Sequence, residues 1–385
     1  IAEFKLINEI FGIEKGNEIL LKQADIIKKH AVDGYLYGRV GEDHFVVIAD
    51  EATFNEEHLY ECRETLQNVL SDSVYNVRVC FGIYRTDNMN ESLSFMCDKA
   101  SFAVASIKDD THSFIAYYDD TMLEAAIKYK TIVDEFDDAI KAGEFKMYLQ
   151  PQISAKTRRL TGAEALVRRI KPDGTIISPI DFIPVYEKSG LISRLDRYIW
   201  EQAAAKLGEW KKAGINMSIS VNISPKDFYY IDIFNTFAGL IKKYDIEPSN
   251  LKIEITETTI MSDVPNLMGE LEELRKAGFT LEMDDFGSGY SSLNTLKDIN
   301  VDVLKVDMGF IKETKNVKKS RIILASVIKM AKELNLLIIT EGVETEEQVD
   351  NLTKLGCDVF QGYYFSKAID VNEFEKRYLY RKKAG

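Results

Sequence analysis

The pattern of apolar and polar positions divides the chain into two segments. From about residue 144 onward, short runs with alternating apolar positions are separated by longer runs in which apolar residues recur every three or four positions. The short runs are typical of strands and the long runs of amphipathic helices. Strands are expected at 146–150, 160–168, 217–222, 251–256, 279–284, 303–307, 336–341 and 357–361, with helices such as 193–213, 263–277, 319–334 and 346–355 between them. This alternation predicts an α/β fold, a (β/α)8 TIM-like barrel over residues 144–385.

Residues 1–119 show a different order of elements. We expect a helix over 4–20 that is punctuated by Gly12 and Gly16, a further helical run through 27, and a β-hairpin over 35–48 with its turn near Gly41 and Glu42. A helix at 56–70, a strand at 76–84 and a helix at 89–107 follow, which indicates a small domain of mixed helices and strands. Residues 120–143 predict a connecting helix, because Thr121 and Glu124 have the Thr-x-x-Glu form of a capping box and Gly143 supplies a stop.

Composition narrows the class of protein. The net charge of -13 argues against a general nucleic-acid binder, which needs a basic surface, but it does not exclude a nucleotide whose phosphates meet bound cations. No run of about 18 apolar residues and no signal peptide is present, and the four cysteines are scattered, so we expect a cytoplasmic protein. Because the chain starts at Ile1 without a Met, we expect a fragment, and the missing N-terminal part could carry a membrane anchor.

Polar side chains stand at the ends of most predicted strands of the second segment. These residues are Glu164, Asn222, Glu254, Asp284, Asp285, Lys305, Asp307, Glu341 and Gln361. In such barrels the carboxyl ends of the strands meet at one mouth, where the chemistry takes place. The alternation along 251–256 supports this arrangement, since its apolar side chains face the helices and Glu254 faces the other way.

Five carboxylates would meet at this mouth, with Lys305 as the one cation. Two like charges about 4 Å apart repel by about 4 kcal/mol at an effective dielectric of about 20. Either several of the carboxyls are protonated or divalent cations lie among them. All four histidines lie in the first third of the chain, so oxygen ligands are expected, which favours Mg²⁺ or Mn²⁺ over Zn²⁺. Two such ions would balance the charge and suit the hydrolysis of a phosphoester.

The same alternation yields a second prediction, one layer below the mouth. Lys252 lies two residues before Glu254, and Glu282 lies two residues before Asp284. Both side chains should therefore point into the barrel from adjacent strands. We expect them to form a buried ion pair with a separation within about 4 Å.

Short motifs follow one another along the second segment, at 150–152 (Gln-Pro-Gln), 164–168 (Glu-Ala-Leu-Val-Arg), 221–222, 254–257, 284–293, 305–307, 341–344 and 361–363. Together they resemble the EAL domain of cyclic di-GMP phosphodiesterases, over the whole segment and in order. The resemblance implies hydrolysis of cyclic di-GMP to linear pGpG with two Mg²⁺ or Mn²⁺ ions as cofactors. One departure follows the second motif, where Arg169 stands at a position that is usually aromatic.

The resemblance also implies roles for individual residues. The positions that match metal ligands are Glu164, Asn222, Glu254, Asp284, Asp285 and Glu341. Lys305 matches the lysine that contacts the attacking water, and Glu341 matches the proposed general base, although the reaction need not use a separate base. Substrate contacts are implied for Gln150, Arg168, Asp307 and Gln361. Glu257 and Glu344 match acids that support the site and its loop, which contains Gly287, Ser288 and Gly289 and couples metal binding to a homodimer interface.

The first segment, through its motifs at 4–12, 16–17 and 41–45, resembles the GGDEF domain of diguanylate cyclases without its first strand. It departs where that family does its chemistry: Glu42 replaces a glycine, His44 replaces an acid, Ala2 replaces a metal-binding Asp and Asn17 replaces a base-recognising Asp. The usual Arg-x-x-Asp product-inhibition site is also absent. We therefore expect no cyclase activity. A regulatory module that binds GTP, with Asn8 as a guanine contact, and a purely structural or dimerising module both remain open.

Three functions are compatible with this sequence. A phosphodiesterase with an inactive, regulatory or structural GGDEF-like domain is favoured, because the second segment keeps every position that matches a metal ligand. Receptors of the same fold, which bind the dinucleotide without cleaving it, tend to lose such ligands. A signalling scaffold that acts through protein contacts is the third possibility.

Overall fold

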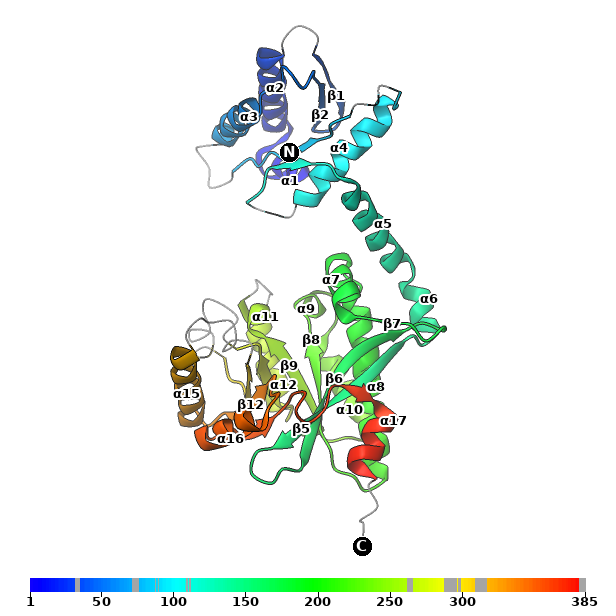
Figure 1. Ribbon diagram of the computed structural model, residues 1–385, viewed down its shortest axis with the longest axis vertical. Helices are drawn as coiled ribbons and strands as arrows, with labels where there is room; N and C mark the ends of the chain where they lie inside the picture. Colours follow the sequence, from blue (N-terminus) through cyan, green and yellow to red (C-terminus); the bar gives the residue numbers. More distant parts are fainter. Residues whose placement is uncertain are drawn as a thin grey trace. The chain divides into compact units, whose positions relative to one another are not determined.

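The structure is a computed structural model that describes residues 1–31, 35–70, 76–86, 88, 90–108, 110, 112–261, 266–286, 296, 299–308 and 317–380 (Figure 1). It divides into two compact units, Ile1–Thr131 and Ile132–Gly385. None of the described helices combines the length and the apolar character that a membrane crossing requires.

In the first unit, two helices replace the single helix expected over 4–20. The helices are α1 (Phe4–Phe11) and α2 (Ile13–His30), so α2 also takes in the second helical run. Gly12 separates them with φ of 85°, a conformation that glycine adopts without steric cost. The punctuation expected at Gly12 is thus a break between two helices, whereas Gly16 lies within α2.

The expected hairpin is confirmed, although its turn lies one residue later than predicted. Its strands are β1 (Leu36–Gly41) and β2 (His44–Ile48), and Gly41 pairs with His44 across the turn. Glu42 occupies the turn with φ of 36°. The remaining elements are α3 (Glu57–Gln67), a 3₁₀ turn (Asn68–Leu70), β3 (Phe81–Ile83), α4 (Leu93–Ile107) and β4 (Ile115–Tyr117), with β3 and β4 parallel.

The connector consists of α5 (Asp120–Asp134) and α6 (Phe136–Lys141), and Gly143 with φ of 64° follows it. The predicted capping box was wrong. Thr121 lies inside the first turn, and the backbone N–H of Thr121 donates to Asp119 Oδ1 at 2.8 Å. The helix begins two residues earlier than a cap at Thr121 would allow, because the carboxylate of Asp119 satisfies this N–H group.

The second unit contains the predicted barrel, with one strand reversed. Its sheet has the order β14-β5-β13-β12-β11-β10-β9-β8-β6-β7, and pairing between β5 and β6 closes it. The strands are β5 (Phe145–Ser154), β6 (Leu160–Ile170), β7 (Ile176–Ile177), β8 (Ile219–Ile223), β9 (Leu251–Thr256), β10 (Leu281–Asp284), β11 (Val303–Asp307), β12 (Leu337–Glu341), β13 (Val359–Phe360) and β14 (Ile369–Asp370). Strand β5 runs antiparallel to β6 and β13. A short loop joins β5 to β6, and parallel strands would need a crossover of about a dozen residues or more.

Helices surround this barrel (Figure 1). They are α7 (Pro179–Ser189), α8 (Ile192–Lys212), α9 (Asp227–Tyr230), α10 (Ile233–Tyr244), α11 (Glu257–Met261), α12 (Leu267–Lys276), α15 (Val317–Glu333), α16 (Glu346–Leu355) and α17 (Val371–Phe374), with a 3₁₀ turn (Pro248–Asn250) and a π-helical turn (Glu375–Leu379). One continuous apolar core lies between helices and strands, and its largest buried side chains include Trp200, Trp210, Phe182 and Phe237.

The predicted ion pair inside the barrel is confirmed. Lys252 Nζ lies 2.8 Å from Glu282 Oε1, and Glu282 is fully buried. Ser220 Oγ donates to the other carboxylate oxygen at 2.8 Å. Burial would raise the pKa of Glu282, but Lys252 and Lys305 hold it below its usual value. The barrel interior therefore contains a charged layer beneath the mouth.

A second buried acidic group lies outside the barrel interior. Asp227 of α9 is fully buried and accepts a hydrogen bond from the Ser224 N–H at 2.8 Å. Burial raises the pKa of Asp227 to about 6. Burial and the neighbouring Asp227 raise the pKa of Asp196 on α8 well above its usual value, and Glu187 adds to the repulsion. This pair of carboxyl groups therefore binds protons more strongly in the folded chain than in the unfolded chain.

We expect the two halves of the Lys252–Glu282 pair to differ in cost when they are removed. Lys252→Met leaves a fully buried carboxylate without its cation and should reduce the free energy of unfolding by about 3–5 kcal/mol. Glu282→Gln leaves an ammonium that is 17% exposed and can reach water, so about 1–3 kcal/mol is expected. The double variant should lose less than the sum. Urea unfolding followed by tryptophan fluorescence reports on this unit, since Trp200 and Trp210 both lie in it. If the two single variants lose the same free energy of unfolding and the double variant loses the sum of the two, the pairing is contradicted.

The Asp196–Asp227 pair predicts a pH dependence of stability. The folded-state pKa of Asp227 is raised, so its stabilising contribution is complete below the unfolded pKa of about 3.8 and is lost as the pH rises through about 6. Asp227→Asn should therefore gain stability relative to the parent protein between pH 5 and pH 8, by about 1–3 kcal/mol. Asp232→Asn is the control. Hydrogen bonds from Asn235 lower the pKa of Asp232, so its charge is constant over this range. A parallel pH trend in both variants would contradict the assignment.

Candidate active site

The ammonium group of Lys305 lies at the centre of the barrel mouth. Lys305 is in the middle of β11 and is fully buried. Its Nζ lies 2.8 Å from Glu341, 3.0 Å from Glu254, 3.2 Å from Asp284 and 3.5 Å from Glu164. The structure thus brings together one cation and four carboxylates that come from five different strands.

The position of each carboxylate follows from strand register. Glu254 of β9 pairs in register with Asn222 of β8 and with Glu282 of β10. Asp284 is the last residue of β10, and Glu341 is the last residue of β12. Because the side chains of a strand alternate between its two faces, these polar residues turn inward while their apolar neighbours pack against the helices.

The charges in this cluster are far from balanced. Burial raises the pKa of Glu254 well above its usual value, and repulsion from Glu164 raises it further. Burial raises the pKa of Glu341 to about 8. Burial alone would lower the pKa of Lys305, but the surrounding carboxylates raise it well above its usual value. One ammonium group therefore stabilises four carboxylates only in part.

Glutamine side chains form one wall of the mouth. Gln361, which follows β13, donates to Glu164 and to Gln150 Oε1, the latter at 3.3 Å. Gln152 Nε2 donates to Gln361 Oε1 at 3.2 Å. Gln150 reaches the mouth although β5 is reversed, because it pairs in register with Glu164. No role was predicted for Gln152, although it shares a strand face with Gln150, which was the available signal.

Asn222 and Asp285 complete the set of predicted metal ligands. Asn222 Nδ2 lies 3.4 Å from Glu164 Oε1. Asp285 follows β10 with φ of 56°, and its backbone N–H donates to Asp284 Oδ1 at 2.9 Å. Burial, together with repulsion from Asp284, raises the pKa of Asp285. The predicted loop residues Gly287, Ser288 and Gly289 lie outside the described residues.

The other predicted residues lie around this cluster. Arg168 is on the same face of β6 as Glu164, four positions further along, and its guanidinium lies 5.9 Å from the Tyr148 ring. Asp307 ends β11 and is exposed, whereas Glu257 begins α11 and is buried. The backbone N–H of Glu344, in the loop before α16, donates to the side chain of Gln348 at 2.7 Å.

The loop after β13 approaches the loop after β12 closely. A Cβ atom on Gly362 would lie 2.2 Å from the carbonyl oxygen of Val343, which is closer than any side chain allows. Gly342 adopts φ of 65° in the facing loop. These glycines allow Glu341 and Gln361 to reach the mouth from adjacent strands.

The donor set fits divalent metal ions. Among the described residues, no three histidine, cysteine or acidic side chains are already arranged around one point as metal ligands; the ammonium of Lys305 lies between the carboxylates. Neither carboxylate oxygen of Glu254 accepts a hydrogen bond, although both are buried. An ionised carboxylate is stable in such a place only with nearby cations, and carboxylate and amide oxygens are ligands that suit Mg²⁺ and Mn²⁺.

Comparison with known proteins identifies both segments. Residues 133–368 match the model of the EAL domain, and residues 1–113 match that of the diguanylate cyclase GGDEF domain. The signaling protein YkoW of Bacillus subtilis is 31% identical over 98% of this chain and 48% of its own length. The bifunctional diguanylate cyclase/cyclic di-GMP phosphodiesterase MucR of Pseudomonas aeruginosa is 28% identical over 96% of this chain and 55% of its own length. The chain thus spans about half the length of these relatives.

A solved structure supports the same assignment. The structure described as the PaMucR phosphodiesterase in complex with c-di-GMP superimposes with a TM-score of 0.60 and 32% identity. It covers 63% of this chain and 99% of its own chain. Because the EAL model alone matches more than half of the residues, the chain belongs to the EAL domain family, with a GGDEF domain before the EAL domain.

Proposed function

We propose that the second unit hydrolyses cyclic di-GMP to linear pGpG. The observation that carries this proposal is the convergence of Glu164, Glu254, Asp284 and Glu341 on Lys305 at the carboxyl ends of the barrel strands. A site of this kind concentrates negative charge that only cations can balance, and a phosphodiester brings further negative charge. The similarity to MucR, a bifunctional diguanylate cyclase/cyclic di-GMP phosphodiesterase with a solved c-di-GMP complex, supports the choice of substrate.

Two Mg²⁺ or Mn²⁺ ions are proposed as cofactors, held by Glu164, Asn222, Glu254, Asp284, Asp285 and Glu341. Bound there, such ions supply Lewis-acid activation and stabilise the charge that develops during phosphoester cleavage. Lys305 would orient the attacking water through its ammonium group. Glu341, at 2.8 Å from Lys305, is placed to accept a proton beside it.

Substrate contacts are proposed for residues at the rim of the mouth. The guanidinium of Arg168 would bind a phosphate, since its donors match phosphate oxygens in pairs. Gln150 and Gln361, which already hydrogen-bond to one another at 3.3 Å, would hold the substrate beside Glu164. Asp307 would contact the substrate from the end of β11, while Glu257, Glu344 and the loop with Gly287, Ser288 and Gly289 would support the site and a homodimer.

The first unit is proposed to be catalytically inactive and regulatory or structural. Its hairpin turn contains Glu42 with φ of 36°, where the resemblance leads one to expect glycine. The Glu42 side chain adds bulk and negative charge at the place where a cyclase brings its backbone close to a triphosphate. Domain boundaries at 1–119, 120–143 and 144–385, and a cytoplasmic location, remain part of this proposal.

Incubation of the full chain with cyclic di-GMP and Mg²⁺ or Mn²⁺ should yield pGpG, detected by chromatography. Asp284→Asn should reduce turnover by more than about a hundredfold, since residues that merely support metal ligands already cost about 10- to 100-fold when changed. The affinity for cyclic di-GMP, measured by isothermal titration, should fall by a smaller factor than turnover.

Asp245→Asn is the matched control for this experiment. Asp245 lies at the end of α10 with φ of 51°, a conformation that Asn tolerates, and its side chain is 90% exposed. The control should keep full activity. Binding without turnover by the unaltered chain, with either metal, would replace the phosphodiesterase by the receptor function, and equal activity of Asp284→Asn would refute the metal assignment.

The GGDEF-like unit should make no cyclic di-GMP from GTP, because Glu42, His44 and Ala2 stand where a cyclase needs small or acidic residues. The assay uses Asp284→Asn, so that any product would not be degraded. Accumulation of cyclic di-GMP would overturn the prediction. A separate titration with GTP decides between the two open roles, since tight binding would exclude the purely structural one.

A further inference from the structure

Arg169 is held in a buried clamp between two carboxylates. Its side chain is 3% exposed; Nη2 lies 2.7 Å from Glu135 Oε2, and Nε lies 2.9 Å from Glu144 Oε2. The guanidinium also lies 5.7 Å from the centre of the Phe145 ring. Burial would lower the pKa of Arg169, but the two carboxylates raise it. The guanidinium of Arg169 thus donates charge-assisted hydrogen bonds to two carboxylates.

The clamp joins the connector to β6, the strand that carries Glu164 and Arg168. Glu135 is the single residue between α5 and α6, and Lys171 adds a second cation 3.6 Å from its other oxygen. Glu144 precedes β5, and its carbonyl accepts the Ile170 N–H at 2.8 Å. Arg169 is close to the end of β6. The clamp therefore connects three chain segments at the point where the connector meets the barrel.

Arg168 and Arg169 point to opposite faces of β6, because side chains alternate along a strand. Arg168 shares its face with Glu164, whose carboxylate lies 3.5 Å from Lys305. Arg169 faces outward, toward Glu135. The backbone of these two residues is therefore fixed on one side by the clamp and presents the proposed phosphate contact on the other.

We propose that Arg169 is a positioning residue that places Arg168 for the substrate phosphate and does so through Glu135 of the connector. This inference rests on the proposed function. Loss of Glu135 frees half of the clamp, and the guanidinium of Arg169 then moves toward Glu144 or toward water, which shifts the end of β6. Substrate affinity is the property that this movement changes, since Glu254, Asp284 and Glu341 are attached to other strands and Glu164 lies five residues before Arg169 on β6.

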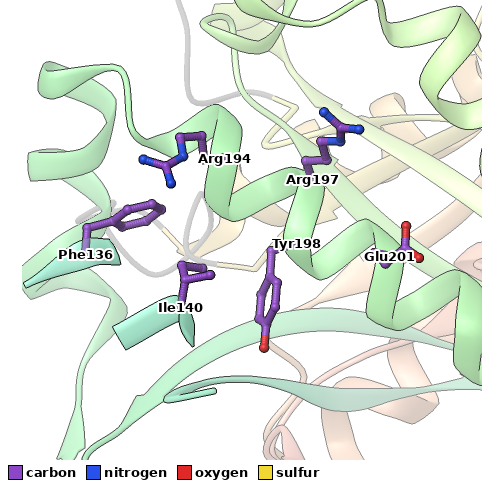
Figure 2. A pocket seen from close by; sticks show the side chains of 6 residues that line it. All are labelled: Phe136, Ile140, Arg194, Arg197, Tyr198 and Glu201. Carbon is purple, nitrogen blue, oxygen red and sulfur yellow. The ribbon is translucent and has the colours of Figure 1, made fainter. Parts of the chain in front are cut away.

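The same junction offers a matched control. Asp137, two residues after Glu135, forms an ion pair with Arg194 of α8 at 2.5 Å. Figure 2 shows Arg194 with Phe136 and Ile140 around a hollow between α6 and α8. The guanidinium of Arg194 lies 5.0 Å from the Phe136 ring. This ion pair fastens the same connector to α8, and neither of its two residues belongs to β6.

The test compares Glu135→Ala with Asp137→Ala in the full chain. Glu135→Ala should raise KM for cyclic di-GMP about three- to tenfold, the loss expected when a charge-assisted hydrogen bond to phosphate is weakened, and leave kcat within about twofold. Asp137→Ala should leave both constants unchanged. Glu135→Ala should have the lower melting temperature of the two variants, because it leaves a guanidinium that is 3% exposed with one carboxylate fewer, whereas Arg194 is 57% exposed. Both variants are assayed at a temperature at which they are folded. Dissociation constants measured in the Asp284→Asn background give the same comparison without turnover.

A double-mutant cycle separates positioning from a merely structural role. Arg168→Ala should raise KM by about tenfold or more. In that background, Glu135→Ala should have no further effect, because the residue through which it acts is gone. If the KM increases caused by Arg168→Ala and Glu135→Ala multiply in the double variant, the inference is overturned. Equal KM values for Glu135→Ala and the unaltered chain would overturn it as well. Either result leaves the proposed function intact. Absence of both binding and turnover in the unaltered chain would instead refute the proposed function, and this inference with it.

Discussion

The mouth of the barrel depends on one electrostatic constraint, the placement of a single buried ammonium among four carboxylates. Lys305 contacts Glu164, Glu254, Asp284 and Glu341 within 3.5 Å. Separating any of these charges from its partners in such a dry place is costly, so the strands that bring them must keep their register. The excess of negative charge is at the same time what makes the site suitable for cations. The excess negative charge of these five side chains therefore destabilises the fold and, at the same time, attracts cations to the site.

A second charged layer makes this arrangement possible. Glu282 lies directly below Asp284 on β10, and without its own cation it would compete for Lys305. Lys252, at 2.8 Å, supplies that cation, and Ser220 satisfies the second oxygen at 2.8 Å. The lower layer is thus neutral and fully paired, whereas the upper layer is not. This difference between adjacent layers concentrates the unbalanced charge at the mouth, where a ligand has access.

Strand parity explains how much of the site the sequence could predict. A period of two fixes which side of a strand each residue faces, so Glu254 and the Lys252–Glu282 pair followed from local pattern alone. The direction of β5 did not, because an alternating pattern reads the same both ways, and only the short loop before β6 decides it. The cap at Asp119 depends on the conformation of a single side chain, so the apolar pattern did not reveal it. The partners of Arg169 lie 25 and 34 residues away in the chain, so no local pattern could reveal them.

Arg169 stands at a position that is usually aromatic in the family, and its contacts give this difference a physical consequence. An aromatic side chain at this position would be satisfied by packing alone, and a small shift of its neighbours would cost little. A buried guanidinium needs its carboxylates in place, because an unpaired charge at 3% exposure is strongly destabilising. Glu135 therefore cannot leave without a response from β6, and β6 cannot shift without a response from Glu135. With arginine at this position, a directional ion pair to Glu135 takes the place of an apolar contact. A shift of the junction between α5 and α6 is therefore accompanied by a shift of the end of β6.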